Sequence, residues 1–483
     1  MASLRTVIGG IGWTSGATIA LAIVATVRLG ILSRILEKAD FGLAALAFFV
    51  LNLSYLLAEF GIHVALMHRK SPSERLLSSL YAFTFSLSVA AYLVLFVAAP
   101  FVADYFEEPE LSTLLRVTTL SLIFSALGGQ HKTLLHKDLR FDLMAYTEIA
   151  GALIALAAAI VFALLGFGVY ALVFSALIQV GLSSTVYAYI GFRRHRYTLR
   201  LRWSEIASTL RIGGFYSGGQ VLNYFSSQAD VFIIGKILGV EILGPYNLMK
   251  ILATKPTKIV ASVSNRVSMP LLAEAQDDPK RLKLFYRRLL KSLSTIGFPL
   301  YLTLAVSAPS LVRIFYGSEY SPYAYLFSIF CLYQILRALL STAGILLVAR
   351  GRTDLGFYWD LVLLATLPMS ILAASYFSIA TVVWTMTLLM AAYLIGVYFF
   401  IIRQLLAISF REYVASFEYG IYFGIAALGI GLTVRWMLGN GIEQFLVSAV
   451  ICLLVWIGGL LKFGHRIDAE LHRKILNRLP IKL

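Results

Sequence analysis

The sequence contains about fourteen apolar runs long enough to cross a lipid bilayer, and this pattern constrains the fold more than any other feature. The bilayer core offers backbone N–H and C=O groups no water, so each run has to form a helix that satisfies them internally. We therefore predict an all-α, polytopic membrane protein. The predicted spans are residues 11–33, 41–63, 76–101, 111–131, 143–165, 169–191, 212–235, 245–265, 290–312, 323–348, 356–377, 379–402, 415–437 and 442–463.

The composition supports the same class. Hydrophobic residues make up 59% of the chain, charged residues only 14%, and the mean hydropathy is +0.82, which excludes a soluble globule. The two cysteines, Cys331 and Cys452, lie inside apolar runs, so we expect neither a disulfide framework nor a cysteine metal site. The N-terminus enters the first run without a small-residue cleavage pattern, so we expect no cleavable signal peptide.

The net charge is +16, and the positions of the basic residues along the chain indicate the membrane topology. Most of the 41 basic residues fall in alternate loops between the runs, with dense clusters at 193–211 and 266–291. Loops that carry such an excess stay in the cytoplasm, which predicts that both termini are cytoplasmic. A nucleic-acid partner is not expected, because the bases form no single stripe.

Two sequence echoes, that is, two pairs of short similar segments, suggest an internal repeat. Residues 34–42 resemble 236–244, and residues 140–143 resemble 352–355, at corresponding places in the helix order. We predict two pseudo-symmetric six-helix bundles followed by two further helices. The predicted parts are an N-terminal lobe at 1–192, a basic cytoplasmic linker at 193–211, a C-terminal lobe at 212–408, additional helices at 409–463 and a basic cytoplasmic tail at 464–483.

The stretch 211–270 carries unusual charge for a membrane segment. We expect two helices joined by a turn at 235–244, with Pro245 at the first position of the second helix. That helix carries three lysines within an arc of about 140°, and each costs roughly 2.5 to 3.5 kcal/mol to insert. One helix face is therefore expected to line a water-filled interior. The lysines are Lys250, Lys255 and Lys258.

Three further charged residues lie within predicted spans. Arg28 either reaches the outer headgroups or faces the substrate. Glu59 shares a helix face with His63, as an interfacial pair or as a proton-coupling site. Asp230 either forms a structural pair, with Lys250 or Arg28, or takes part in coupling.

Other polar residues favour ordinary structural roles. Arg337 is expected to pair with Asp360 of the next helix. Glu148 lies close enough to an interface to be solvated. His131 and His136, five apart at a helix end, are also expected to be solvated, and no histidine spacing suits a metal ion.

The segment 280–291 is predicted to form a basic amphipathic helix in the cytoplasmic interface, with Leu282, Phe285 and Leu289 on its buried side. Its ligand is anionic inner-leaflet lipid or a specific protein partner. The outer loops are short, the longest lying near 104–110. An enzyme acting at the outer surface would need a folded outer segment, so we do not expect an enzyme.

Several motifs together resemble a known family. They are Leu32-Ser-Arg-Ile-Leu36 with Asp40-Phe-Gly42, Leu134-Leu-His-Lys-Asp-Leu-Arg-Phe141, Asp230-Val-Phe-Ile-Ile-Gly235 with Leu243-Gly-Pro-Tyr246, Asp278-Pro-Lys-Arg-Leu282 and Leu311-Val-Arg-Ile-Phe-Tyr-Gly317. In these motifs the chain resembles the Wzx-type polysaccharide flippases, lipopolysaccharide or exopolysaccharide exporters of the multidrug/oligosaccharidyl-lipid/polysaccharide superfamily. The colanic-acid and teichuronic-acid exporter branch is the most similar.

The resemblance implies two lobes around a cavity that opens alternately to each side of the bacterial inner membrane. It implies an undecaprenyl-diphosphate-linked oligosaccharide as substrate, with a polysaccharide polymerase complex as a candidate partner. A diphosphate needs cations, which Arg28, Lys250, Lys255 and Lys258 would supply. Sugar hydroxyls need polar and aromatic groups, and the candidates, for which a plain packing face is the alternative, are Tyr216, Asn223, Tyr224 and Gln228.

We therefore expect a flippase that makes and breaks no bond and needs no cofactor. H⁺ and Na⁺ are the candidate coupling ions, and Glu59 and Asp230 the candidate coupling residues. The alternatives are a cation-coupled multidrug exporter, which would prefer an acidic cavity, and a polytopic polymerase or O-acyltransferase, which would need a larger outer loop or a membrane-embedded histidine at the reaction face.

Overall fold

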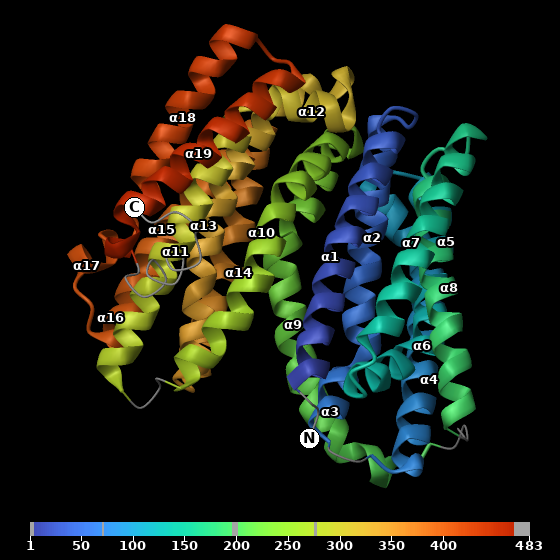
Figure 1. Ribbon diagram of the computed structural model, residues 1–483. Coiled ribbons are helices and arrows are strands. Elements are labelled where there is room, and N and C mark those ends of the chain that lie inside the picture. The colour runs from blue at the N-terminus through green and yellow to red at the C-terminus, as the bar shows by residue number, and fades with distance from the viewer. Residues whose placement is uncertain (1–3, 70–71, 196–200, 275–277, 468–483) are drawn as a thin grey trace. The chain divides into compact units, whose positions relative to one another are not determined.

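The computed structural model is built from helices in its described part, residues 4–69, 72–195, 201–274 and 278–467 (Figure 1). Some side chains within these ranges, among them those of residues 258–274, lie outside the description. Contacts divide the chain into two compact units, Met1–Asn247 and Leu248–Leu483. The expected all-α, polytopic class is confirmed.

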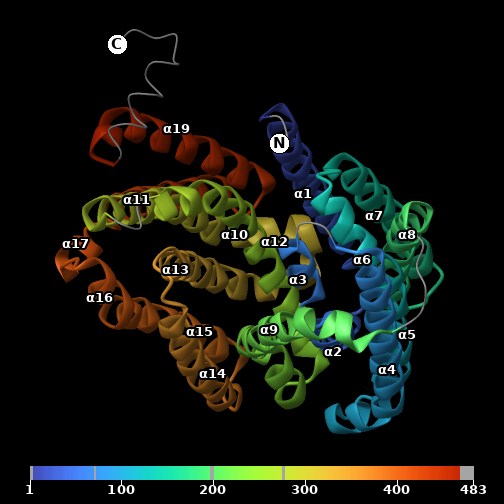
Figure 2. The same cartoon turned by 90° about the horizontal axis from the view of Figure 1, so that it is seen from below.

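The first unit contains nine helices and the start of a tenth within the described residues. They are α1 (Leu4–Leu32), α2 (Lys38–Glu59), α3 (Ile62–His68), α4 (Glu74–Phe106), α5 (Glu110–Thr118), α6 (Leu120–Lys137), α7 (Phe141–Leu164), α8 (Tyr170–Arg194), α9 (Trp203–Ile237) and α10 (Val240–Glu274). Among the helices that could cross a membrane, α2 is the most enclosed, with 61% of its most apolar stretch buried. Helices α6, α7 and α8 pack side by side, and α1 packs along α7 (Figures 1 and 2).

The second unit is organised around α11 and α13. Its elements are α11 (Pro279–Val306), α12 (Ala308–Tyr316), the 3₁₀ helix η1 (Ser318–Tyr323), α13 (Ala324–Ala349), α14 (Thr353–Ser375), α15 (Ile379–Val397), the π-helical turn η2 (Tyr398–Ile402), α16 (Arg403–Leu406), α17 (Phe410–Val414), α18 (Glu418–Leu438) and α19 (Ile442–Ile467). Helix α13 packs against α11 and α15 (Figure 2). Helix α11 also packs against α18.

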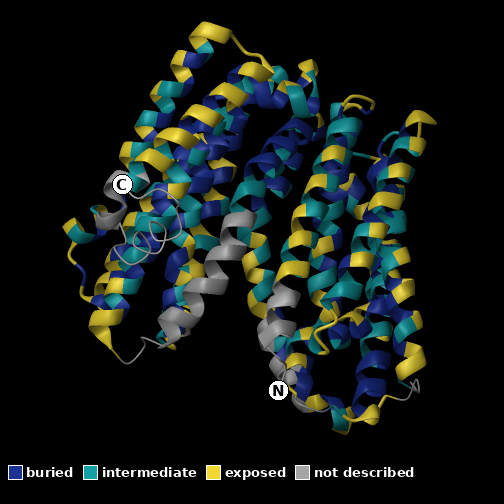
Figure 3. Cartoon of the chain, viewed as in Figure 1, coloured by how far each residue is buried: buried dark blue, intermediate teal, exposed yellow. Residues whose placement is uncertain are grey.

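Exposed residues recur along the helices of both units (Figure 3), and many of them are large and apolar. Large examples are Leu164 on α7, Phe377 after α14 and Trp436 on α18, with exposed fractions of 70%, 80% and 87%. Exposed apolar area of this extent is typical of a surface in contact with lipid tails rather than water. The protein is therefore a multi-pass membrane protein.

Twelve helices of the described part are long and apolar enough to cross a membrane. The predicted spans at 212–235 and 245–265 fall within α9 and α10, which are helical and 35 residues long but are not among these twelve. The predicted turn at 235–244 is wrong. The chain turns at Leu238 and Gly239, where Gly239 has a φ of +79°, so α10 already begins at Val240 and Pro245 lies inside it.

The two sequence echoes correspond to similar local structures. Arg140 pairs with Asp142 at the start of α7, and Arg352 pairs with Asp354 at the start of α14. The glycines of the other echo, Gly42 and Gly244, lie at one helix crossing in the first unit. A Cβ on Gly42 would lie 2.8 Å from Val240 Cα, and one on Gly244 would lie 3.0 Å from the carbonyl carbon of Lys38.

The separate interfacial helix predicted at 280–291 is wrong. Its residues form the first turns of α11, which continues to Val306. Leu282 and Tyr286 are fully buried and Leu289 is 8% exposed, so this face packs against protein and not against lipid. Lys283 and Arg287 instead pair with Glu412 of α17, at 2.9 and 3.3 Å.

Candidate functional site

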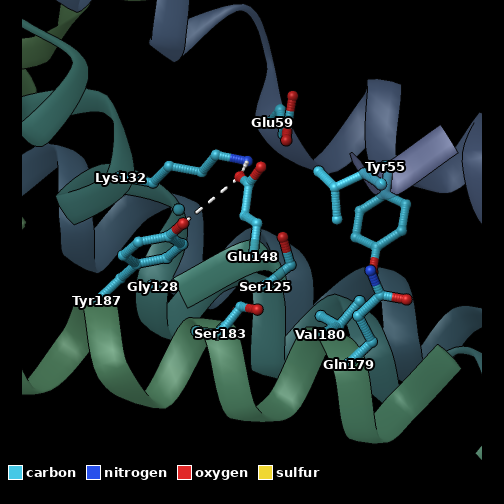
Figure 4. A pocket seen from close by; sticks show the side chains of 13 residues that line it. Tyr55, Glu59, Ser125, Gly128, Lys132, Glu148, Gln179, Val180, Ser183 and Tyr187 are labelled. Atoms are coloured by element: carbon cyan, nitrogen blue, oxygen red, sulfur yellow. Dashed lines mark hydrogen bonds and ion pairs between the residues drawn. The ribbon is translucent and has the colours of Figure 1, made fainter. Parts of the chain in front are cut away.

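The first unit contains a polar cavity of about 470 Å³ among α1, α2, α6, α7 and α8 (Figure 4). A second pocket of about 300 Å³ adjoins it. The two pockets share five lining residues, namely Tyr55, Glu59, Ser125, Gly129 and Lys132. Cavities of this size are typical of small-molecule sites.

Glu59 reaches the cavity because α2 ends there. Phe60 and Gly61 both adopt left-handed backbone angles, with φ of +44° and +62°, and the short helix α3 then begins in a new direction. A Cβ on Gly61 would lie 2.7 Å from the Cα of Gly213 in α9, so only glycine allows the two backbones to approach this closely.

The break in the helix removes the predicted shared face of Glu59 and His63. The His63 ring Nδ1 is hydrogen-bonded to Thr133 Oγ1 at 2.7 Å. No hydrogen bond or ion pair to Glu59 is present within the described part of the chain, although Glu59 and His63 both line the smaller pocket.

An ion pair crosses the larger pocket. Lys132 of α6 lies 2.7 Å from Glu148 Oε1 of α7, and the Tyr187 hydroxyl of α8 donates to the same oxygen at 3.4 Å (Figure 4). The Glu148 side chain is 27% exposed and that of Lys132 47% exposed. The expectation that Glu148 is merely solvated is wrong, because it lies in the pocket wall with two partners.

Small residues bring these three helices together. A Cβ on Gly128 of α6 would lie 2.6 Å from Ser184 Cα of α8, and one on Gly151 of α7 would lie 2.8 Å from Ser183 Oγ. Close backbone approach through small residues is the usual packing mode of membrane helices. It positions Lys132, Glu148 and Tyr187 so that one carboxylate receives both other side chains.

Arg28 of α1 joins the same region. Its Nη1 donates to Gln179 Oε1 of α8 at 3.3 Å, and Gln179 itself lines the larger pocket. An amide neutralises no charge, and no carboxylate pairs with Arg28 among the described residues. No carboxylate of the described residues therefore neutralises the guanidinium beside the cavity, which agrees with an inward role better than with the outer headgroups.

The candidates on α9 lie elsewhere in the first unit. The Tyr224 hydroxyl donates to the Phe49 carbonyl at 3.0 Å and its ring stacks on that of Phe49, with centroids 5.5 Å apart. These contacts agree with the packing alternative. Asn223 is exposed and Gln228 is half-buried, while the side chain of Tyr216 lies outside the described residues.

Asp230 is also part of this packing. It is 1% exposed and accepts a hydrogen bond from the buried hydroxyl of Tyr246. A hydrogen-bonded, enclosed carboxylate of this kind agrees with the structural alternative.

The predicted cationic helix face belongs to α10. Lys250 is 9% exposed and Lys255 is half-buried, and both make polar or electrostatic contacts. The side chain of Lys258 lies outside the described residues. The role of the three lysines remains a prediction.

Two structural expectations are wrong. Arg337 on α13 and Asp360 on α14 form no ion pair in the described part of the chain, and Asp360 is exposed. His131 is 1% exposed and its ring packs against Tyr81 and Phe192, at centroid distances of 5.6 and 5.1 Å.

Sequence reasoning missed Lys132 and Tyr187 and assigned Glu148 to solvent. Lys132 and Glu148 come from different helices of a hairpin, so no helical periodicity joins them. The available signal was two charged residues inside apolar segments of span length, which by itself favours a functional site.

The chain resembles known proteins along most of its length. Residues 31–325 match the model of a family described as polysaccharide biosynthesis protein. The lipopolysaccharide biosynthesis protein WzxC of Escherichia coli is 24% identical over 422 residues, covering 87% of this chain and 86% of WzxC. The teichuronic acid biosynthesis protein TuaB of Bacillus subtilis is 23% identical over 474 residues, covering 97% and 98%.

Among solved structures, the fold is similar to that of the lipid II flippase MurJ in an inward closed conformation. The TM-score is 0.70 at 15% sequence identity, with 96% of this chain and 100% of the MurJ chain covered. This likeness confirms the expected fold, and the relatives confirm the expected family resemblance.

Proposed function

Because the chain belongs to the polysaccharide biosynthesis protein family, we propose that it moves undecaprenyl-diphosphate-linked oligosaccharide repeat units across the bacterial plasma membrane. The substrate would pass from the inner to the outer leaflet by alternating access, for exopolysaccharide or O-antigen assembly. Relatives named for lipopolysaccharide and teichuronic acid biosynthesis support this proposal, as does the fold shared with a lipid II flippase. Translocation leaves the substrate chemically unchanged, so the protein is not an enzyme in this proposal.

The observation that carries the proposal is the charged cavity inside a membrane-embedded unit. Glu59, Lys132 and Glu148 all belong to helices of membrane-spanning length. Each ionisable group in such a position costs several kcal/mol unless it faces water or a polar ligand. A polar headgroup in transit is a ligand of this kind, whereas a purely structural bundle would gain nothing from the cavity.

In this proposal the diphosphate is held by cations. Arg28 is suited to it, because its recorded partner is the neutral amide of Gln179 and its planar guanidinium can bind two phosphate oxygens at once. Lys250, Lys255 and Lys258 are proposed as the further cations. Tyr216, Asn223, Tyr224 and Gln228 remain candidates for sugar contacts, with Tyr224 the weakest because its hydroxyl and ring already bind Phe49.

Transport against back-flow requires an energy source, and we propose that H⁺ or Na⁺ supplies it through Glu59. This carboxylate lies in the pocket wall without a hydrogen-bond or ion-pair partner among the described residues, whereas Asp230 is already bound to Tyr246. Glu59→Gln should abolish gradient-driven flipping, and Asp230→Asn should mainly lower stability. Gradient-dependent flipping by Glu59→Gln at the wild-type rate would contradict the assignment.

The proposed orientation places both termini in the cytoplasm, with the basic loops facing anionic lipid of the inner leaflet. A polysaccharide polymerase complex on the outer side would receive the product. Cysteine-free variants carrying single reporter cysteines at 197 and 475 would test the orientation, because both should be labelled only from the cytoplasmic side.

The function itself is tested in proteoliposomes that hold a fluorescent undecaprenyl-diphosphate oligosaccharide. An impermeant quencher added outside removes only the outer-leaflet signal, so the loss of signal over time reports flipping. Wild type should flip the lipid, and Lys250→Ala, Lys255→Ala and Lys258→Ala should each reduce the rate. Lys236→Ala is the matched control, because Lys236 pairs with the exposed Glu107.

One observation favours a second candidate, a cation-coupled multidrug exporter. The larger pocket has two carboxylates, Glu59 and Glu148, against the single base Lys132, and an acidic lining of this kind favours drug cations. Uptake of ethidium in the same proteoliposomes discriminates between the two. Ethidium transport without any lipid flipping would replace the flippase proposal.

A further inference from the structure

The larger pocket of the first unit has features that the transport of a diphosphate does not explain. Its lining has two carboxylates and one lysine, so it offers no excess of positive charge with which to hold a diphosphate. The charge already cancels between Lys132 and Glu148, which are paired at 2.7 Å. The pocket is therefore suited to an uncharged ligand with many polar groups.

Hydrogen-bonding groups on several sides of the pocket remain available to such a ligand. Lys132 and Tyr187 both contact Oε1 of Glu148, which leaves Oε2 as an acceptor among the described contacts. The bond from the Tyr187 hydroxyl is 3.4 Å long, near the upper limit of a hydrogen bond, so this hydroxyl can turn to a better partner. Ser183 adds a hydroxyl one helical turn earlier on the same face of α8.

The pocket also offers aromatic surface. The rings of Tyr55 and Tyr187 lie on different walls, and the volume of about 470 Å³ is within the range of small-molecule sites (Figure 4). Acceptors, donors and aromatic rings together match a pyranose, which has hydroxyls at its rim and C–H groups on its faces. A diphosphate or a lipid tail uses no such combination.

We propose that this pocket binds an uncharged sugar residue of the lipid-linked substrate, with Glu148, Tyr187 and Ser183 as ligands for its hydroxyl groups. The inference rests on the proposed function and assigns the sugar to a site inside the first unit, separate from the α9 residues that the sequence suggested. Arg28 at the edge of the same pocket, bound to Gln179, then stands where a diphosphate attached to that sugar would follow.

The test measures binding to the full-length protein in lipid nanodiscs by thermophoresis. The probes are undecaprenyl diphosphate, the same lipid carrying one uncharged hexose, and ethidium. The variants are Tyr187→Phe and Ser183→Ala, and the control is Tyr189→Phe. Tyr189 lies on the same helix but is 57% exposed, with its ring against Arg193 and outside the pocket.

Wild type should bind the hexose lipid more tightly than the bare lipid. Tyr187→Phe and Ser183→Ala should each weaken hexose-lipid binding by about three- to tenfold, the usual effect of one lost hydrogen bond, and leave bare-lipid binding unchanged. Tyr189→Phe should change neither. Thermal unfolding of each variant checks that the fold is retained.

The other outcomes overturn the inference in distinguishable ways. Equal binding of both lipids by wild type, or equal weakening of both by the variants, removes the sugar site and leaves the flippase proposal intact. Binding of neither lipid removes the flippase proposal and the sugar site with it. Weakening of ethidium binding alone assigns the pocket to an organic cation.

Discussion

The crossing of α2 with the start of α10 gives the sharpest prediction, because two glycines meet there. A Cβ on Gly42 would lie 2.8 Å from Val240 Cα, whereas ordinary contacts begin at 3.4 Å. The Val240 carbonyl oxygen would lie nearer still, so the two backbones must separate by well over about 0.6 Å to admit one methyl group. Overpacking of this kind costs about 1–3 kcal/mol, which corresponds to a fall of roughly 2–12 °C in melting temperature for a unit of this size.

The matched control is Gly218→Ala in α9. Gly218 is also helical and lies in the same unit, but a Cβ there would meet nothing within 4 Å. Alanine is the better helix former, so the control should melt at or slightly above the wild-type temperature. Thermal unfolding of the purified protein in detergent, followed by size-exclusion fluorescence, measures both variants.

The double variant Gly42→Ala with Gly244→Ala tests the cause. Both methyl groups would force open the same crossing, so the second should cost less than it does alone. The expected fall in melting temperature is smaller than the sum of the two single falls. A Gly42→Ala variant as stable as Gly218→Ala, or strictly additive single effects, would refute the close-approach reasoning.

Three further predictions concern charge and access. Hydrogen bonds from the Ser409 backbone amide and, to a smaller extent, from Lys283 lower the pKa of Glu412 to about 2. The ionised Glu412 therefore stabilises the fold fully above a pH of about 4.5, and this contribution is lost as the pH falls towards 2. In Glu412→Gln, melting curves recorded at several pH values should show less loss of stability in acid. Lys132→Met should lower the flipping rate at least tenfold, because it leaves the charge of Glu148 without its partner. Adding Glu148→Gln to the same chain should restore the melting temperature but not transport. Unchanged transport by Lys132→Met would show that the pocket lies outside the transport pathway. Cys331 and Cys452, both buried, should resist a membrane-permeant maleimide until the protein unfolds, and rapid labelling of the native protein would contradict their placement.

The sequence predicted some residues of the candidate site but not the ion pair within it. Arg28 and Glu59 were identifiable because a charge inside an apolar run stands out locally. Lys132 and Glu148 were assigned little weight, since each lies near a helix end and their pairing depends on how α6 packs on α7. The burial of His131 against Tyr81 and Phe192 likewise depends on three different helices.

The sequence by itself determined the class of protein. Apolar runs of bilayer length predict helices, and the alternation of basic loops predicts how they insert in the membrane. The paired motifs at 140–143 and 352–355 predict a repeated architecture. All three properties follow from local composition. Only the tertiary structure decided that α2 ends at Glu59, that the segment 280–291 is the start of α11 with one face packed against protein, and that a polar pocket joins α6, α7 and α8. These features depend on contacts between residues far apart in the chain, such as Gly61 with Gly213 and Gly128 with Ser184, and no local pattern encodes which backbones approach each other.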